Sequence, residues 1–170
     1  IMALVVGLPV TFLFIADEEI GSPTTRALIA TDARRHRYVL VPEPSRGDTA
    51  VTGRHAFQRF RVTAHGRPAH AGATNLQGRS AISAMARLIA KIESMSDFKR
   101  GETYAVGVVQ GGQWVNVVPI ECHAQVLCVS PTEESVEAVR RNMLALAGEV
   151  DGVRIEVEAG PVRPLFRAHD

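Results

Sequence analysis

The pattern of hydrophobic and polar positions changes near residue 49, and this change divides the chain into two predicted domains. Before that point, Val10–Ile15 and Tyr38–Val41 are apolar on both faces, which is typical of strands in a parallel sheet. Thr24–Arg37 lies between them and is predicted to be a helix. A right-handed crossover would place the two strands parallel in one sheet. We therefore assign residues 1–48 to a partial parallel α/β unit.

After residue 49, apolar and polar positions alternate, as expected for antiparallel strands with one buried face. The predicted order is β–α–β–β–α–β, with strands at Val51–Ala64, Tyr104–Val109, Ile120–Ser130 and Arg154–Glu158, and helices at Ser80–Ser94 and Val136–Ala147. Val115–Val118 is also strand-like. This order is that of the ferredoxin-like fold, with a four-stranded antiparallel sheet and two helices on one face. The fold class is α/β (α+β), with residues 49–165 forming the second domain and 166–170 returning to the first.

Composition narrows the possible partners. The chain has 170 residues, of which 46% are hydrophobic and 22% charged, as in an ordinary globular protein. Its net charge of +1 implies no nucleic-acid partner, and we see no membrane span or signal peptide. Cys122 and Cys128 lie in one predicted strand, roughly 20 Å apart, which is too far for a disulfide. Either a reducing compartment or a simple lack of disulfides fits this cysteine usage, and we expect a cytoplasmic protein.

Acidic residues follow both predicted strands of the first unit. Asp17–Glu19 come directly after one strand, and Glu43 follows the other, between two prolines. The acids at 17–19 have two interpretations. They could accompany the start of a helix capped by Ser22, because helix N-termini favour nearby acids. Alternatively they could bind a cation, since ligands bind at the carboxyl ends of strands. The convergence with Glu43 favours the cation site.

Four motifs carry a resemblance to a known family: Ala-Asp-Glu-Glu-Ile-Gly-Ser at 16–22, Pro-Glu-Pro at 42–44, Gly-Arg-Pro-Ala-His-Ala-Gly at 66–72 and Asn-Val-Val-Pro at 116–119. The chain resembles the middle of a co-catalytic zinc peptidase or deacylase, from the family of glutamate carboxypeptidase, acetylornithine deacetylase, succinyl-diaminopimelate desuccinylase and aminoacylase. The resemblance implies two zinc ions (or cobalt or manganese) and a peptide or N-acyl amino acid substrate. It also implies cleavage of a C–N amide bond and a homodimer formed through residues 49–165.

The resemblance assigns roles residue by residue. Glu18 matches the general base, which takes a proton from the metal-bridging water and passes one to the leaving amine. Glu19 matches a ligand of one zinc, and Glu43 matches a ligand of the other. His70 matches a histidine that reaches across the dimer and stabilises the oxyanion. Asn116 matches a substrate contact. From residue type alone, His70 is an exposed loop histidine and Asn116 a turn residue. Trp114 has two interpretations, packing and substrate stacking, of which the sequence favours packing.

Two departures from the family pattern limit the expected activity. The family's His-x-Asp motif and its second histidine ligand do not occur, so Glu19 and Glu43 alone cannot complete a zinc site. We expect the chain to belong to a longer protein, with Ile1–Leu8 as the end of a helix, and to bind zinc poorly alone. Leu127–Val129 replaces the Asp-x-Arg that helps to hold a substrate carboxylate in many members. The alternatives are a self-associating dimerisation module without its own catalysis, and a metal-free relative.

Overall fold

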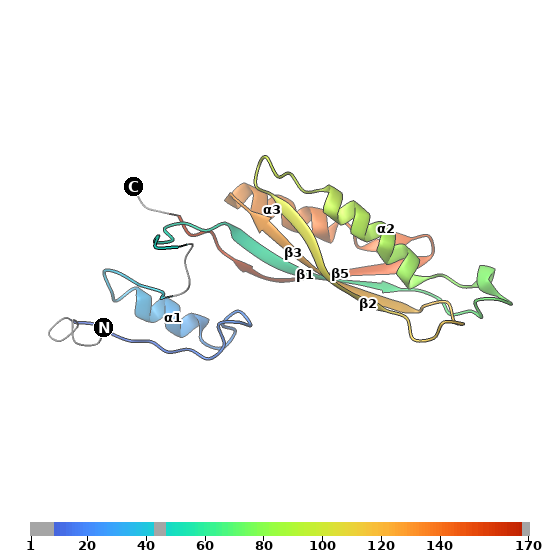
Figure 1. Cartoon of the computed structure of the whole chain (residues 1–170), viewed down its shortest axis with the longest axis horizontal. Helices are drawn as coiled ribbons and strands as arrows, with labels where there is room; N and C mark the ends of the chain where they lie inside the picture. Colours follow the sequence, from blue (N-terminus) through green and yellow to red (C-terminus); the bar gives the residue numbers. More distant parts are fainter. Residues whose placement is uncertain (1–8, 43–46, 168–170) are drawn as a thin grey trace. The chain divides into compact units, whose positions relative to one another are not determined.

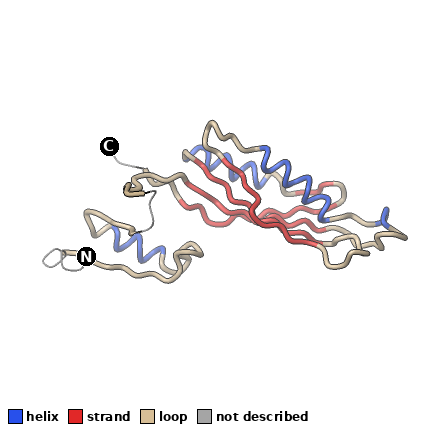
Figure 2. Tube along the Cα trace, in the orientation of Figure 1, coloured by secondary structure: helices blue, strands red, loops and turns tan. Residues whose placement is uncertain are grey.

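The structure is a computed structural model that describes residues 9–42 and 47–167. It divides into two compact units, Ile1–Thr49 and Ala50–Asp170. Figure 1 labels most of their helices and strands, and Figure 2 distinguishes helix, strand and loop along the chain. The predicted helix end at Ile1–Leu8 lies outside the described residues. Within those residues, no helix has the length and apolar character that crossing a bilayer requires.

The first unit contains one element in its described part, the helix α1 (Arg26–Ala33). The predicted strands at Val10–Ile15 and Tyr38–Val41 are wrong, because both segments are irregular. They are also exposed, with Phe14 at 91% and Leu40 at 89%. A strand needs a hydrogen-bonded neighbour, and the described part of this unit provides none for either segment. The first unit is therefore not a parallel sheet here.

The second unit confirms the predicted order of elements. Its sheet has the strand order β2-β3-β1-β5-β4, and all neighbouring strands are antiparallel. The helices α2 and α3 lie on one face of this sheet (Figure 1). The elements are β1 (Ala56–His65), the 3-10 helix η2 (Asn75–Gln77), α2 (Ala81–Ser94), β2 (Thr103–Gly111), β3 (Glu121–Ser130), α3 (Glu133–Leu144), β4 (Gly148–Val150) and β5 (Val153–Arg163).

The structure adds one short strand to the four predicted. The predicted helix over 136–147 instead begins at Glu133, because Thr132 and Ser135 form a capping box that fixes its first turn. It ends at Leu144, and Gly148 opens β4. β4 pairs with β5 across a two-residue turn, Asp151-Gly152, and both of these residues have positive φ.

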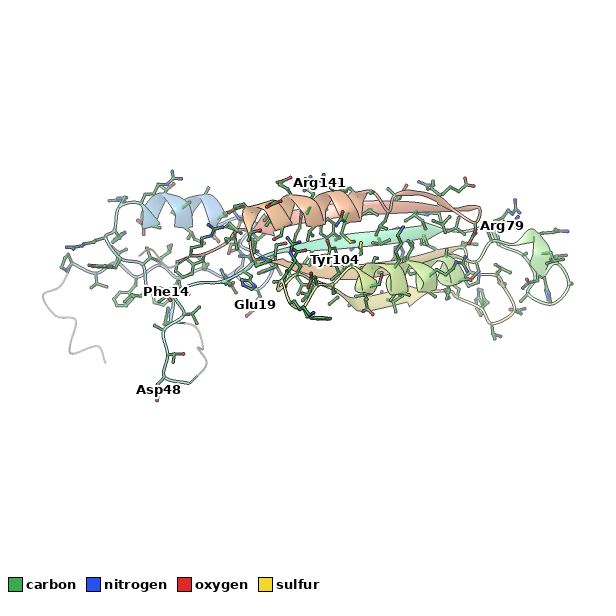
Figure 3. All side chains as sticks on the ribbon, turned by 90° about the horizontal axis from the view of Figure 1, so that it is seen from above. Phe14, Glu19, Asp48, Arg79, Tyr104 and Arg141 are labelled. Atoms are coloured by element: carbon green, nitrogen blue, oxygen red, sulfur yellow. The ribbon has the colours of Figure 1, made fainter. Side chains whose placement is uncertain are left out.

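The core lies between the sheet and the two helices. Alternate residues of β1 and β3 face it, and α2 contributes one apolar stripe: Ala81, Ala84, Met85, Leu88 and Ile92. Each large side chain buried in this way contributes roughly 1.5–3 kcal/mol. Tyr104 of β2, labelled in Figure 3, accepts a hydrogen bond from the Asn142 side chain of α3 at 3.2 Å. This bond joins the edge of the sheet to the second helix.

Both cysteines are unpaired and buried in β3, as the sequence predicts. Burial raises the pKa of the Cys128 thiol to about 12 and raises that of Cys122 above its ordinary value. Thiols of this kind stay protonated near neutral pH and are poor nucleophiles. We conclude that both cysteines pack in the core and do not act as nucleophiles.

β2 is a long edge strand with a bulge. Its pairing with β3 shifts between Val106 and Val108, which leaves Gly107 as the extra residue. A Cβ placed on Gly107 would meet nothing within 4 Å. Val108 and Val109, which follow the bulge, are among the exposed large apolar residues. On the opposite side of the sheet, β4 has only three residues and pairs with β5 only over 153–155. β2 is therefore a nine-residue edge that is available to another chain.

Candidate functional site

Two loops at one end of the second unit are joined by backbone hydrogen bonds. The Ala71 amide donates to the Asn116 carbonyl at 2.9 Å, and the Val118 amide donates to the Ala69 carbonyl at 2.9 Å. Between these bonds, His70 and Val117 form an isolated antiparallel bridge. The structure therefore brings His70 and Asn116, both predicted from sequence, to the same end of the domain. Val115–Val118 is a turn with this single bridge and not the strand suggested by its residues.

The imidazole of His70 is held in one orientation by its own loop. Its Nδ1 accepts hydrogen bonds from the backbone amides of Gly72 at 3.2 Å and Ala73 at 3.1 Å. The Thr74 hydroxyl accepts a bond from the His70 amide at 3.1 Å, and the Thr74 amide returns one to the His70 carbonyl at 3.1 Å. A nitrogen that accepts two N–H bonds carries no proton, so the neutral ring carries its proton on Nε2. The exposed His70 can thus donate a hydrogen bond from Nε2.

The motif at 66–72 begins with glycine because other backbone atoms lie very close to Gly66. A Cβ at Gly66 would lie 2.1 Å from the Arg79 carbonyl oxygen and 2.9 Å from the Pro119 carbonyl oxygen. The Gly66 amide also donates to the Ile120 carbonyl at 2.8 Å, so the strand end of β1 is pressed against both loops. Arg79, labelled in Figure 3, lies at the end of the domain from which the η2 loop projects. The close approach leaves no room for a side chain.

We expect Gly66→Ala to lower the free energy of unfolding by about 2–3 kcal/mol, because rigid backbone atoms must move to admit the methyl group. Gly107→Ala is the matched control, because a Cβ there meets open space, and we expect a change within about 0.5 kcal/mol. Urea unfolding of the second unit measures both. Equal stability of the two variants would contradict the close approach at Gly66.

A hollow of about 570 Å³ lies beside these loops. Its lining includes Ala71, Asn75, Ile82, Trp114 and Val117. The sequence favours Trp114 as a packing residue, but its side chain is 71% exposed. The interpretation is therefore wrong, because the Gly111-Gly112 turn carries Trp114 out of the core. The position of Trp114 two residues before Asn116 is the feature of the sequence that could indicate a place at the candidate site.

In the first unit, Asp17 organises the approach to α1. Its carboxylate accepts hydrogen bonds from the Thr24 amide and hydroxyl, each at 2.9 Å, from the Thr25 amide at 3.3 Å, and from the Thr25 hydroxyl. These donors, the Thr25 hydroxyl first, lower the pKa of Asp17 to about 2. The helix-start interpretation thus holds for Asp17. Ser22 does not cap the helix, because it has a positive φ of 51° and the N-cap position is Thr25.

We expect the Asp17 carboxyl to titrate with a midpoint near 2 in a carbon-detected NMR titration, below its ordinary value of 3.8. A carboxyl with a lowered folded-state pKa stabilises the folded turn above the unfolded value, and this contribution is lost as pH falls through the folded value. The relevant window therefore runs from about 3.8 down to about 2. Thr25→Val removes the strongest donor and should raise the midpoint. An unchanged midpoint in this variant would contradict the assignment.

The other predicted acids do not gather into a site within the described residues. Glu18 and Glu19 are exposed in the turn that follows Asp17, and Figure 3 labels Glu19 there. Glu43 lies outside the described residues. Across 9–42 and 47–167, no three His, Cys, Asp or Glu side chains are grouped so that they could hold a metal ion.

The face of the sheet that no helix covers carries two arginine side chains beside Phe57. Leu127 and Val129 of β3 lie opposite Arg59 and Phe57 of β1. The Arg59 and Arg163 guanidinium carbons each lie 5.9 Å from the centre of the Phe57 ring. Arginine side chains from the adjacent strands β1 and β5 thus lie around one aromatic ring on this face. Leu127 and Arg59 also line a second hollow, of about 360 Å³.

Four titratable side chains lie together farther along the same face. His65 Nε2 lies 2.9 Å from Glu156, and its Nδ1 lies 3.7 Å from Glu121. His123 Nε2 lies 3.3 Å from the same Glu121. These histidines match no motif. His65 contacts glutamates of the two neighbouring strands, and His123 contacts a glutamate of its own strand, so polar contacts on the sheet surface account for their position.

An antiparallel sheet with two helices on one face, and with two joined loops at one end, defines a ferredoxin-like α/β module. Residues 52–153 match the family model described as the peptidase dimerisation domain of the M20 family. The chain belongs to this family, whose members include hydrolases.

Similar proteins are named as a carboxypeptidase, a deacetylase and an aminopeptidase. A probable carboxypeptidase of Uncinocarpus reesii is 31% identical over 130 residues, which cover 67% of this chain and 29% of the relative. An acetylornithine deacetylase of Myxococcus xanthus is 29% identical over 125 residues, covering 67% and 32%. The crystal structure of aminopeptidase PepT from Bacillus cereus matches with a TM-score of 0.61 and 26% identity, covering 71% of this chain and 33% of that one. The chain thus spans about a third of these proteins.

Proposed function

We propose that this chain is part of a dizinc-dependent amidohydrolase that cleaves a C–N amide bond of a peptide or N-acyl amino acid. In this proposal the second unit forms a homodimer and presents His70 and Asn116 to the active site of the partner subunit. The observation that carries the proposal is the fixed His70 ring, whose Nδ1 accepts two backbone bonds and whose Nε2–H is available. The relatives named as carboxypeptidase, deacetylase and aminopeptidase support amide hydrolysis.

Amide hydrolysis passes through a tetrahedral intermediate whose oxygen carries a negative charge. A preorganised N–H donor stabilises this oxygen as the charge develops. The neutral His70 ring would donate from Nε2, and the exposed Asn116 side chain would add an amide contact to substrate. Glu18 would take a proton from the attacking water as the O–C bond forms, and would give one to the amine as the C–N bond breaks.

Zinc, which would supply an acidified water near neutral pH, is the cofactor of this proposal, with cobalt or manganese as substitutes. The described residues do not by themselves fit such a centre, because they contain no group of three suitable ligands. Glu19 and Glu43 would hold one zinc each, and a zinc site takes about four ligands in all. The remaining ligands would have to come from other parts of a longer protein.

We therefore expect the 170-residue chain alone to bind zinc weakly and to lack amidase activity. Isothermal calorimetry should show no submicromolar binding of zinc, and Glu19→Gln should leave the weak signal unchanged. Submicromolar, stoichiometric binding that Glu19→Gln abolishes would refute this expectation. It would mean that the chain holds a complete site.

A self-associating module without its own catalysis is the second candidate. The specific observation in its favour is the nine-residue edge strand β2, whose Val108 and Val109 are exposed. Light scattering with and without zinc tests it, and we expect a dimer that does not depend on zinc. A monomer under both conditions would argue against both the module and the delivery of His70 to a partner. Two buried, unpaired cysteines fit a cytoplasmic location, which is part of the same proposal.

A further inference from the structure

The hollow beside His70 has an apolar rim that points into solvent. Trp114 is 71% exposed, and Val115 next to it is fully exposed. The turn that carries them is fixed by the Val117 amide, which donates to the Trp114 carbonyl at 3.3 Å, and by the positive φ of 78° at Gly112. Val117 in turn bridges to His70. The exposed indole is thus attached by short backbone connections to both predicted site residues.

Leaving these side chains in water is unfavourable. Burying an indole or an isopropyl group would gain roughly 1.5–3 kcal/mol each. Adjacent exposed apolar groups that line a hollow mark a binding surface more often than a chance arrangement does. Ile82 of α2 extends the apolar lining on the other wall. The hollow therefore presents an aromatic and aliphatic surface that is exposed to solvent.

We propose that this hollow binds an apolar side chain of the substrate, aromatic or branched, next to the scissile bond, and that Trp114 determines this specificity. The proposal rests on the proposed function, because His70 places the reacting carbonyl at the same loops. A volume of about 570 Å³ suits a small-molecule group. Asn75, Ser80 and Gln113 in the lining provide polar atoms for an amide backbone. Offset stacking on the indole would orient an aromatic ring.

Trp114 is the single tryptophan of the chain, so tryptophan fluorescence reports this hollow alone. We expect N-acetyl-phenylalanine to cause a saturable change in the emission of the 170-residue chain, and N-acetyl-glycine to bind at least about tenfold more weakly. Ile82→Ala should weaken the first probe severalfold while leaving the indole in place. Equal responses to both probes, or no saturation, would overturn the proposal. A blue shift that grows with protein concentration alone would also overturn it, because a second copy would then occupy the hollow.

The full-length enzyme provides the second readout. Trp114→Ala should lower kcat/KM for substrates with an aromatic side chain by about 10–100-fold and leave the glycine analogue within about twofold. An equal loss on both substrates would contradict a specificity role and indicate structural damage. If the full-length protein has no amidase activity, the proposed function is wrong. The fluorescence titration would still decide whether the hollow binds an apolar group.

Discussion

Mixing two inactive variants of the full-length enzyme, Glu18→Gln and His70→Ala, is expected to restore about a quarter of the wild-type activity. Random exchange of subunits makes about half of the dimers mixed. In each mixed dimer, one site combines an intact Glu18 with the intact His70 of the partner subunit. The other site lacks both groups. The recovery follows only if His70 acts across the dimer.

The single variants set the baseline for this experiment. Glu18→Gln removes the proposed general base and should lower kcat by about 10²–10⁴-fold. His70→Ala removes the Nε2–H donor and should lower kcat by about 10²–10³-fold. His65→Ala is the matched control, because His65 lies on the uncovered face of the sheet, bonded to Glu156. Its removal should leave kcat within about twofold, since surface ion pairs contribute little.

Subunit exchange must be achieved by co-expression or by refolding the mixture. If exchange is demonstrated by light scattering of size-tagged subunits and no activity returns, His70 serves its own subunit. The proposal that His70 acts in the partner's active site would then be wrong. Its role in stabilising the oxyanion would still be supported by the loss of activity in the His70→Ala variant.

Placing a lysine at the bulge of β2 is expected to separate the dimer without unfolding the domain. A Cβ at Gly107 meets no atom within 4 Å in the subunit itself, so the first carbon of the lysine side chain has room and the fold should keep its stability. An edge strand that pairs with a second copy cannot easily accept a charged side chain at that position. We expect the dissociation constant of the dimer to rise about 10–100-fold, measured by sedimentation.

Ala147→Lys is the matched control for this variant. It adds the same charge at an exposed position that precedes β4, at the opposite edge of the sheet. The dissociation constant should stay within about twofold of the wild-type value. A dimer that withstands Gly107→Lys but breaks with Ala147→Lys would place the interface on β4 instead.

The second unit was predictable because its local patterns agree with its tertiary structure. β1 alternates between core and surface, and α2 has one apolar stripe below a Ser80 cap, so period and cap define each element. β4 was missed because three residues carry no period. The turn that makes it was visible, since Asp151-Gly152 is a pair that favours a two-residue hairpin.

The first unit shows where sequence patterns mislead. Val10–Ile15 and Tyr38–Val41 have the composition of buried strands, but composition cannot supply a hydrogen-bonding neighbour. The candidate site was likewise predictable only in part. The motif predicted His70 and Asn116 separately, whereas their joining depends on the pairing of loops remote in sequence. The exposure of Trp114 follows from a turn whose direction the sequence does not specify.

The central place of β1 has a consequence for how the chain acquires its structure. The ribosome synthesises its two neighbouring strands, β3 and β5, much later than β1. Thr63 contacts His123, which is 60 residues further along the chain, and His65 contacts Glu156, which is 91 residues further along. At ordinary translation rates, β1 waits on the order of 5–20 s for β5. Contacts this distant also make folding slow. Newly made β1, with both edges open, is therefore the strand of the second unit that stays open longest to a chaperone or a neighbouring nascent chain.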